Sequence, residues 1–188
     1  AGGAEGGAAA ESSGAVLSVE LDAHRACVVL PRNLAKAASP ASCAALANAQ
    51  YFPALFGGAD GARPVHFDRI LADVPCSGDG TARKNAQVWR SWRRKECLEL
   101  FSRQRAILLR ALHLLPCGGV CAYATCSMNP VENEAVVFSA LRRWQGKAEL
   151  LDAHAACAEA GLGLRPGAGL TRWVVPAPER GGALFAAW

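Results

Sequence analysis

Two short apolar segments on either side of a long helical one set the fold class of this chain. Residues 67–74 and 120–125 have the bounded, apolar character of buried strands. Between them, over residues 96–115, apolar side chains recur at the spacing of one helix face. The later strand, Val-Cys-Ala-Tyr-Ala-Thr, is continuously apolar, which is typical of a parallel-sheet strand buried on both faces. Strands that alternate with helices in this way predict an α/β fold with a parallel sheet.

The amino-terminal part of the chain adds shorter elements. Residues 1–15 are rich in Gly and Ala, lack apolar periodicity and are expected to form a flexible tail. Residues 16–21 and 44–46 are expected to be short strands. Asp22 can cap a helix that follows the first of these strands. Pro31 should kink or end that helix.

A second helix is expected after residues 120–125. Asn129 should cap it, with Pro130 at the first helical position and Glu132 completing a capping box. The helix should run to about Trp144. Short strand-like runs follow at residues 149–151 and 173–175.

Length and composition exclude several classes of protein. The 188 residues suit one domain, and 52% apolar with 19% charged residues is ordinary for a soluble globular chain. No apolar run reaches the roughly 18 to 20 residues of a membrane span. The first residues lack the basic and apolar regions of a secretory signal. We therefore expect an intracellular, reducing compartment and no association with a membrane.

Most of the eight cysteines are expected to be reduced packing residues. Several of them lie in runs that read as helix or strand, where free cysteine is commonly buried. Cys117 and Cys121 are the closest pair, but no second Cys or His pair follows at the spacing of a zinc site. The sequence therefore predicts neither a disulfide framework nor a metal centre.

Cys76 and Cys126 stand apart because each follows the carboxyl end of a predicted strand. In open α/β sheets that edge is where ligands bind. Cys76 lies in Asp-Val-Pro-Cys-Ser-Gly-Asp-Gly, which sets Asp73 beside a thiol in a rigid turn with glycines that let the backbone approach a flat ligand. Cys126 precedes the second helix, and a helix N-terminus lowers the pKa of a nearby thiol. Each loop alone is equally compatible with a plain strand end and turn.

Two thiols and a carboxyl group suit the methylation of a pyrimidine at C5. That carbon is a poor nucleophile, and addition of a thiolate at C6 converts the ring into an enamine-like species that can take up a methyl group. An acid near N3 stabilises the charge that develops on the ring. A proton must then leave C5, and the thiol must be expelled.

Cations and indoles are interleaved after the first cysteine loop. Arg83 and Lys84 precede the run Trp-Arg-Ser-Trp-Arg-Arg-Lys at residues 89–95, in a chain of net charge +4. Such a pattern suits neutralisation of phosphates together with base stacking, with Arg83, Lys84, Arg93 and Arg94 as candidate RNA contacts. The same run also suits a solvated helix start with Arg stems lying along apolar surface.

These motifs, in this order, resemble the Sun-type RNA (cytosine-5) methyltransferases, most closely the eukaryotic tRNA-modifying branch. The resemblance spans roughly Val16 to Trp188 and includes Asp-Val-Pro-Cys-Ser-Gly-Asp-Gly-Thr, Arg-Lys-Asn, Val-Trp, Ser-Arg-Gln-Arg and Gly-Gly-Val. It continues through Tyr-Ala-Thr-Cys-Ser-Met-Asn-Pro-Val-Glu-Asn-Glu, Gly-Leu-Thr-Arg-Trp and the terminal Phe-Ala-Ala-Trp. It implies a Rossmann-like class I methyltransferase fold, S-adenosylmethionine as methyl donor, and tRNA or another RNA as partner.

The resemblance also implies residue roles. Cys126 would be the nucleophile toward C6, and Cys76 would assist release of the methylated base. Asp73 would contact the N3 side of the pyrimidine and lie near the donor. Glu20 matches the acid that holds the donor's ribose, and Asn48 stands near the adenine where the family commonly has Asp. A nuclear location, nucleolus included, is implied as well, with the cytoplasm as the alternative.

One motif of the family is missing. Its first strand and Gly-rich turn should precede Val16, and nothing in the tail supplies them. We therefore expect residues 16–188 to be a partial catalytic domain of an N-terminally truncated enzyme. The alternatives are a non-catalytic RNA-binding remnant of the family, a DNA cytosine methyltransferase and a thiol redox protein. The thiol redox protein is disfavoured because the chain lacks Cys-x-x-Cys, and a DNA cytosine methyltransferase does not explain the second thiol motif.

Overall fold

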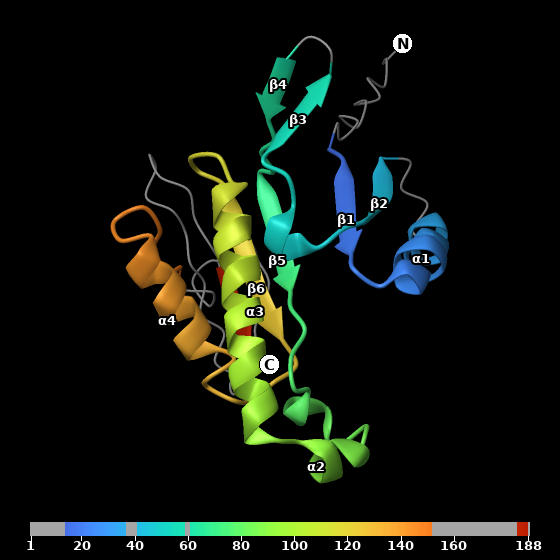
Figure 1. Ribbon diagram of the computed structural model, residues 1–188, viewed down its shortest axis with the longest axis vertical. Coiled ribbons are helices and arrows are strands. Elements are labelled where there is room, and N and C mark those ends of the chain that lie inside the picture. The colour runs from blue at the N-terminus through green and yellow to red at the C-terminus, as the bar shows by residue number, and fades with distance from the viewer. Residues whose placement is uncertain (1–13, 37–40, 59–60, 152–183, 188) are drawn as a thin grey trace, which may run out of the picture. The chain divides into compact units, whose positions relative to one another are not determined.

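The chain folds into two compact units. The structure is a computed structural model that describes residues 14–36, 41–58, 61–151 and 184–187. The first unit is Ala1–Ala49 and the second is Gln50–Trp188. Figure 1 labels their helices and strands.

The first unit is a β-α-β element. The two predicted short strands are present as β1 (Val16–Glu20) and β2 (Ser42–Leu46), which pair in parallel. Asp22 caps the intervening helix, because its Oδ1 accepts the backbone N–H of Arg25 at 2.7 Å. A π-helical turn, η1 (Arg25–Val29), leads into α1 (Leu30–Lys36).

Pro31 does not end this helix, contrary to one of the two predicted outcomes. It is the second residue of α1, and the helix continues to Lys36. Proline removes one backbone N–H and its ring crowds the preceding turn. The wider turn η1 lies directly before it, with the N–H of Leu30 bonded to the carbonyl of Arg25. Such π-turns are one way that a helix accommodates a disrupted hydrogen-bond ladder.

The second unit contains the parallel sheet. Strands β5 (Arg69–Asp73), β6 (Val120–Thr125) and β7 (Leu184–Ala187) lie side by side in that order and all run parallel. Between β5 and β6 the chain forms two short helical turns and one long helix: η3 (Asp79–Thr81), α2 (Gln87–Ser91) and α3 (Arg94–His113). Helix α4 (Glu134–Arg143) follows β6 and lies alongside α3 (Figure 1). The α/β parallel architecture is therefore confirmed.

The core lies between the sheet and these two helices. Leu108 and Leu112 of α3 meet Cys121 and Tyr123 of β6 and Val136 of α4, all fully buried. Along β6 the buried residues alternate with half-buried ones. The expectation that this strand is buried on both faces is wrong for the described residues, because only the side facing α3 and α4 is covered completely.

An antiparallel hairpin precedes the parallel strands of this unit and was not predicted. It consists of β3 (Leu55–Gly58) and β4 (Gly61–Pro64) and follows the short turn η2 (Ala49–Tyr51). The sequence signal was the glycine-rich run at residues 57–61, which includes an Asp-Gly dipeptide. Near its base, the rings of Phe52 and Phe67 meet edge to face with centroids 6.0 Å apart.

Helix α4 begins later than the sequence predicts. Its first residue is Glu134, and Asn129–Asn133 form turns that precede it. Asn129 still organises this entry, since its Oδ1 accepts the N–H of Val131 at 3.0 Å. The predicted capping box is wrong, because the Asn129 N–H is bonded to Ser127 Oγ and not to Glu132. Residues 149–151 are not a strand, and the predicted strand at 173–175 lies outside the described residues.

Strands β1 and β5 each keep one open edge in the described part of the chain. There β1 pairs with β2 alone, and β5 pairs with β6 alone. Leu71, in the middle of β5, is 71% exposed. This is the arrangement expected for a partial Rossmann-like sheet. In the same residues, no helix combines the length and the hydropathy of a membrane span.

Candidate active site

The two cysteine loops leave the same edge of the sheet. Strands β5 and β6 are parallel and in register, with Asp73 opposite Ala124. The pairing extends one step further, since the N–H of Val74 bonds the carbonyl of Ala124 at 3.1 Å. The segments that follow β5 and β6 therefore leave the sheet at the same level, and Cys76 and Cys126 lie within a few residues of these strand ends.

The two thiols are in direct contact. The Sγ atoms of Cys76 and Cys126 are 3.0 Å apart, too far for a disulfide bond of about 2.05 Å. The backbone N–H of Cys126 also points at the sulfur of Cys76, at 3.3 Å. The structure thus brings together two residues that are separated by fifty positions in the sequence and that the sequence analysis singled out as a pair.

The environments of the two thiols differ. Cys76 is half-buried, whereas Cys126 is exposed. Burial, and next the hydrogen bond that the Cys76 thiol shares with Cys126, raises the pKa of Cys76 from 9.0 to about 12. Cys76 consequently keeps its proton at neutral pH and can donate it in a hydrogen bond to the sulfur of Cys126. An exposed sulfur that accepts such a bond is the better placed of the two to attack a ligand.

A glycine turn locks one loop against the other. Gly80, in η3, donates its N–H to the carbonyl of Cys126 at 3.1 Å, and Asp79 Oδ1 accepts the N–H of Met128 at 2.7 Å. A Cβ atom on Gly80 would lie 2.7 Å from the Cys126 carbonyl oxygen. The close backbone approach that the sequence suggested for a ligand is made here to the other cysteine loop.

A buried carboxylate beneath both loops was not predicted as a site residue. Glu132 is fully buried and bonds to Ser77, the residue after Cys76, and to Ser127, the residue after Cys126. The sequence signal was present, because Glu132 and both serines belong to the motifs quoted above. It was assigned to helix capping instead. Cys126 is also separated from α4 by residues 127–133, so the predicted position directly before a helix N-terminus is wrong.

Asp73 is the last residue of β5 and its side chain is exposed. It lies three residues before Cys76, at the edge of the sheet from which the cysteine loops project. An exposed carboxyl group at this edge can reach a ligand that also contacts the thiols. The structure therefore places Asp73 and the two cysteines at one edge of one unit.

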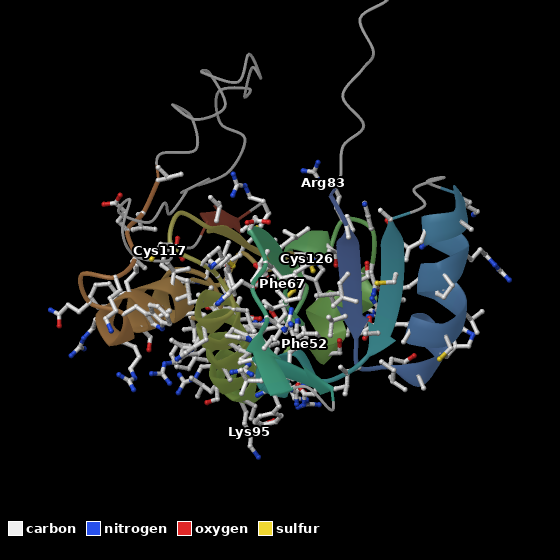
Figure 2. All side chains as sticks on the ribbon, turned by 90° about the horizontal axis from the view of Figure 1, so that it is seen from above. Phe52, Phe67, Arg83, Lys95, Cys117 and Cys126 are labelled. Carbon is white, nitrogen blue, oxygen red and sulfur yellow. The ribbon has the colours of Figure 1, made fainter. Side chains whose placement is uncertain are left out.

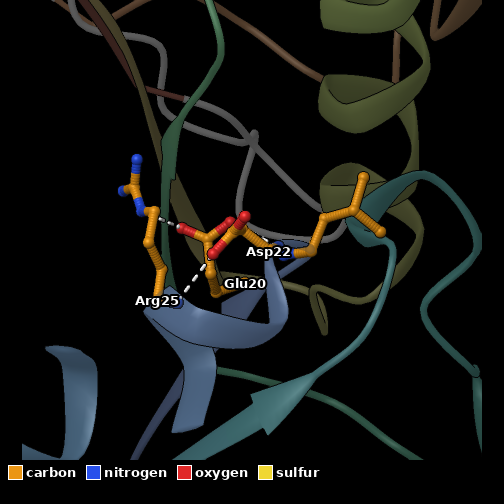
Figure 3. Close-up of polar contacts among 4 residues, drawn as sticks. Glu20, Asp22 and Arg25 are labelled. Atoms are coloured by element: carbon orange, nitrogen blue, oxygen red, sulfur yellow. Dashed lines mark hydrogen bonds and ion pairs between the residues drawn. The ribbon is translucent and has the colours of Figure 1, made fainter. Parts of the chain in front are cut away.

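The two donor-site candidates, Glu20 and Asn48, belong to the first unit. Glu20 ends β1, and Figure 3 shows its carboxylate at the start of the following helix. Its Oε1 accepts the N–H groups of Leu21 and Asp22, and its Oε2 pairs with Arg25 Nε at 2.9 Å. Asn48 follows the end of β2 and is half-buried.

The candidate RNA contacts lie on either side of the short helix α2. Arg83 and Lys84 directly follow η3, the turn bonded to the Cys126 loop, and both are exposed. Arg93 and Arg94 are exposed at the start of α3, where Arg93 Nε is 4.0 Å from Glu96. In Figure 2, Arg83 and Lys95 project to opposite sides of the view. Of the candidate RNA contacts, Arg83 and Lys84 are the ones that adjoin the turn bonded to the Cys126 loop.

Comparison with known families gives a match over nearly the whole chain. The family described as 16S rRNA methyltransferase RsmB/F matches residues 8–188. That range includes both cysteine loops, Glu132 and the basic run.

Individual relatives agree with this match. The chain is 43% identical over 168 residues to the multisite-specific tRNA:(cytosine-C(5))-methyltransferase of Saccharomyces cerevisiae, covering 88% of this chain and 24% of that protein. It is 37% identical over 168 residues to the tRNA (cytosine(34)-C(5))-methyltransferase of Drosophila melanogaster, covering 88% and 22% respectively. The chain thus spans about a quarter of the length of these curated relatives.

The fold also matches a solved structure. NSun6 from Pyrococcus horikoshii, whose crystal structure was determined with SFG, aligns with a TM-score of 0.61 at 23% sequence identity. The alignment covers 74% of this chain and 32% of that one. This likeness supports the Rossmann-like fold assigned to the chain.

Proposed function

Because this chain belongs to the 16S rRNA methyltransferase RsmB/F family, we propose that it carries the catalytic site of an RNA cytosine-C5 methyltransferase that acts on tRNA. The single observation that supports this most strongly is the contact between Cys76 and Cys126, with sulfurs 3.0 Å apart at the edge of the sheet. At this separation one sulfur can bond to a ring carbon while the other donates a hydrogen bond to it.

The first step that we propose is addition of Cys126 to the cytosine ring. Its thiolate forms a bond to C6, and the electron pair of the C5–C6 double bond moves toward C5 and N3. The thiol of Cys76 keeps its proton and stabilises the attacking sulfur through its hydrogen bond before attack. We propose that Asp73, which is exposed at the end of β5, contacts the N3 side of the ring.

The second step is release of the methylated base. A proton leaves C5 to solvent, its electron pair restores the C5–C6 double bond, and the C6–S bond breaks with its electrons returning to Cys126. Charge returns to a sulfur that faces the protonated thiol of Cys76. We propose that this hydrogen bond makes Cys126 a better leaving group, which is how Cys76 assists release.

S-adenosylmethionine, when bound, supplies the methyl group. Glu20 fits its ribose, because acids at the carboxyl ends of parallel strands hold ribose hydroxyls in Rossmann-like folds. Asn48, after the end of β2, offers an amide to the adenine. The relative NSun6 was crystallised with SFG, an analogue of this donor. No Gly-rich turn for the methionine end is found in the described residues. Equilibrium binding of labelled S-adenosylmethionine by the full-length protein, with Glu20→Ala as the weakened variant, tests this assignment.

We propose that Arg83, Lys84, Arg93 and Arg94 contact RNA phosphates. Arg83 and Lys84 adjoin the turn that is bonded to the Cys126 loop, so a backbone bound there lies next to the thiols. Trp89 and Trp92, both exposed, offer rings on which unpaired bases can stack. The target cytosine must leave its stack to reach both sulfurs, which favours unpaired or distorted positions in the RNA. Replacing Arg83 by Gln should reduce the salt dependence of RNA binding by about one unit of slope.

The test of this function uses alanine at each thiol in the full-length protein. Cys126→Ala should abolish methylation of tRNA, and Cys76→Ala should accumulate a covalent protein–RNA adduct on denaturing gels when S-adenosylmethionine is present. Cys117→Ala is the matched control, because this exposed cysteine lies before β6 at the opposite end of the strand from Cys126 (Figure 2). It should leave both readouts unchanged.

The outcomes separate the alternatives. An adduct with Cys126→Ala and none with Cys76→Ala would reverse the two roles. RNA binding without donor binding, methylation or adduct in the wild type would favour a non-catalytic RNA-binding remnant.

Two broader assignments are also proposals. We propose that residues 16–188 form part of the catalytic domain behind a tail of residues 1–15. A nuclear location, nucleolus included, is proposed from the family resemblance alone, and imaging of the tagged full-length protein tests it.

A further inference from the structure

A buried carboxylate ties the two cysteine loops together. Glu132 has 0% of its surface exposed and lies in the turn that precedes α4. Its Oε2 accepts the backbone N–H of Ser77 at 2.8 Å and the side-chain N–H of Gln104 at 3.0 Å. Its Oε1 accepts the hydroxyls of Ser77 at 2.5 Å and Ser127 at 3.1 Å.

These contacts fall on the immediate neighbours of both thiols. Ser77 follows Cys76, and Ser127 follows Cys126. Gln104 completes the arrangement from α3, because its Nε2 also donates to the carbonyl of Pro75, the residue before Cys76, at 2.9 Å. One carboxylate and one amide therefore fix the backbone on both sides of Cys76 and on the far side of Cys126.

The carboxyl group of Glu132 is surrounded by hydrogen-bond donors. In the part of the chain that the structure describes, no Lys, Arg or His forms an ion pair with it. A buried carboxylate without a cation is costly unless hydrogen-bond donors surround it. The four donors cannot be withdrawn singly without leaving this charge poorly solvated, so the two loops are held together as one unit.

We propose that Glu132 is a positioning residue that sets the separation of Cys76 and Cys126. The proposal rests on the proposed function and deepens it, because it says how the attacking sulfur of Cys126 is held within hydrogen-bond distance of the Cys76 thiol. Its central measurement concerns the thiols themselves and needs neither RNA nor donor.

The length of the side chain, and not its charge, should matter for positioning. In Glu132→Gln the side-chain carbonyl oxygen can still accept the N–H groups of Ser77 and Gln104. The new NH₂ group can donate to the hydroxyls of Ser77 and Ser127, because a hydroxyl accepts as well as donates. Aspartate retains the charge but withdraws the carboxylate by about 1.5 Å, the length of one carbon–carbon bond. Glu132→Gln should therefore preserve the thiol pair, and Glu132→Asp should loosen it.

The experiment measures how readily the two thiols form a disulfide. The full-length protein is equilibrated with reduced and oxidised glutathione. Two protein thiols lose two electrons and two protons and form a disulfide, and oxidised glutathione takes these up and becomes two molecules of reduced glutathione. The fraction of the peptide pair linked through Cys76 and Cys126 is measured by mass spectrometry. The sulfurs must close by about 1 Å to bond, so the equilibrium reports on their separation.

The expected result is an ordered series. Glu132→Gln should lie within about 3-fold of wild type, and Glu132→Asp should lower the effective thiol concentration by about 10-fold or more, because small misplacements of reacting groups are amplified. Ser127→Ala, which removes only the tie to the Cys126 loop, should fall between them. Glu134→Asp is the matched control, because that residue begins α4 and should leave the value unchanged.

Several results would overturn the proposal. Wild-type disulfide formation in both Glu132→Asp and Ser127→Ala would do so, as would a loss in Glu132→Gln as large as in Glu132→Asp. If Glu132→Asp is unfolded by circular dichroism, Ser127→Ala decides. Abolished methylation in Glu132→Gln, with its thiol pair intact, would make Glu132 a participant in proton transfer instead. If the variants show the expected order of disulfide formation but the wild type gives neither methylation nor adduct, the positioning role of Glu132 stands and the proposed reaction is rejected.

Discussion

Replacing Gly80 by alanine tests whether the two cysteine loops must touch for the site to work. The new Cβ would lie 2.7 Å from the carbonyl oxygen of Cys126, about 0.7 Å short of the 3.4 Å at which ordinary contacts begin. Because the obstacle is backbone, it cannot rotate away, and the η3 turn must shift relative to the Cys126 loop. That shift weakens the bonds from Gly80 N–H to Cys126 and from Met128 N–H to Asp79.

The expected size of the effect follows from this displacement. Overpacking of this kind costs about 1 to 3 kcal/mol, which lowers Tm by about 2 to 12 °C for a chain of this length. A shift of this size at a reacting group reduces the rate by about 10- to 100-fold. Thermal unfolding and single-turnover methylation of tRNA by the full-length protein measure the two quantities.

Gly14→Ala is the matched control for this substitution. A Cβ at Gly14 meets nothing within 4 Å, so the same chemical change should leave Tm and rate unaltered. If Gly80→Ala has the Tm and the rate of wild type, the close packing of the two loops is not required and the reasoning fails.

The remaining predictions concern the thiols and their surroundings. Iodoacetamide at pH 8 should modify Cys126 at least several-fold faster than Cys76, because burial raises the pKa of Cys76 to about 12; peptide mass spectrometry follows both sites, and equal rates would contradict the different environments. Burial also raises the pKa of Cys121 from 9.0 to about 12, so the folded state resists its ionisation, and the stability present below pH 9 should decline as pH rises from 9 toward 12. Tm measured at pH 8 and 10.5 should fall less in Cys121→Ala than in wild type. Tyr123→Phe removes the hydrogen bond to the Glu132 carbonyl at 2.6 Å and should cost about 1 to 3 kcal/mol in urea unfolding, and an unchanged midpoint would show that water replaces the hydroxyl.

The sequence predicted an element and its bounds well where one local signal dominated. Val120–Thr125 is a strand with the predicted bounds, because five apolar residues and a threonine lie between a Gly-Gly stop and the cysteine loop. The long helix of the second unit was shifted by only two residues at each end. Both cysteines were placed at strand ends, since Pro75 stops β5 and Thr125 ends β6.

The sequence was insufficient where tertiary contacts outweigh a local pattern. Asn129, Pro130 and Glu132 fit a capping box, yet Glu132 bonds to two serines that lie far apart in the chain, and the helix starts only at Glu134. No rule based on neighbouring residues indicates that Glu132 bonds to Ser77, which lies fifty-five positions away. Strand β7 was missed because four residues near the end of a chain carry too little periodicity to be recognised before their pairing with β6 is known.

The open side of β5 has a consequence for work with this polypeptide. Its backbone amides and carbonyls on that side have no strand partner in the described residues, and Leu71 adds an apolar side chain beside them. Such an edge recruits any extended segment that can complete the ladder. Preparations should therefore self-associate at high concentration unless a further strand occupies this position, and a lysine introduced at the Leu71 position would act as a gatekeeper against that association.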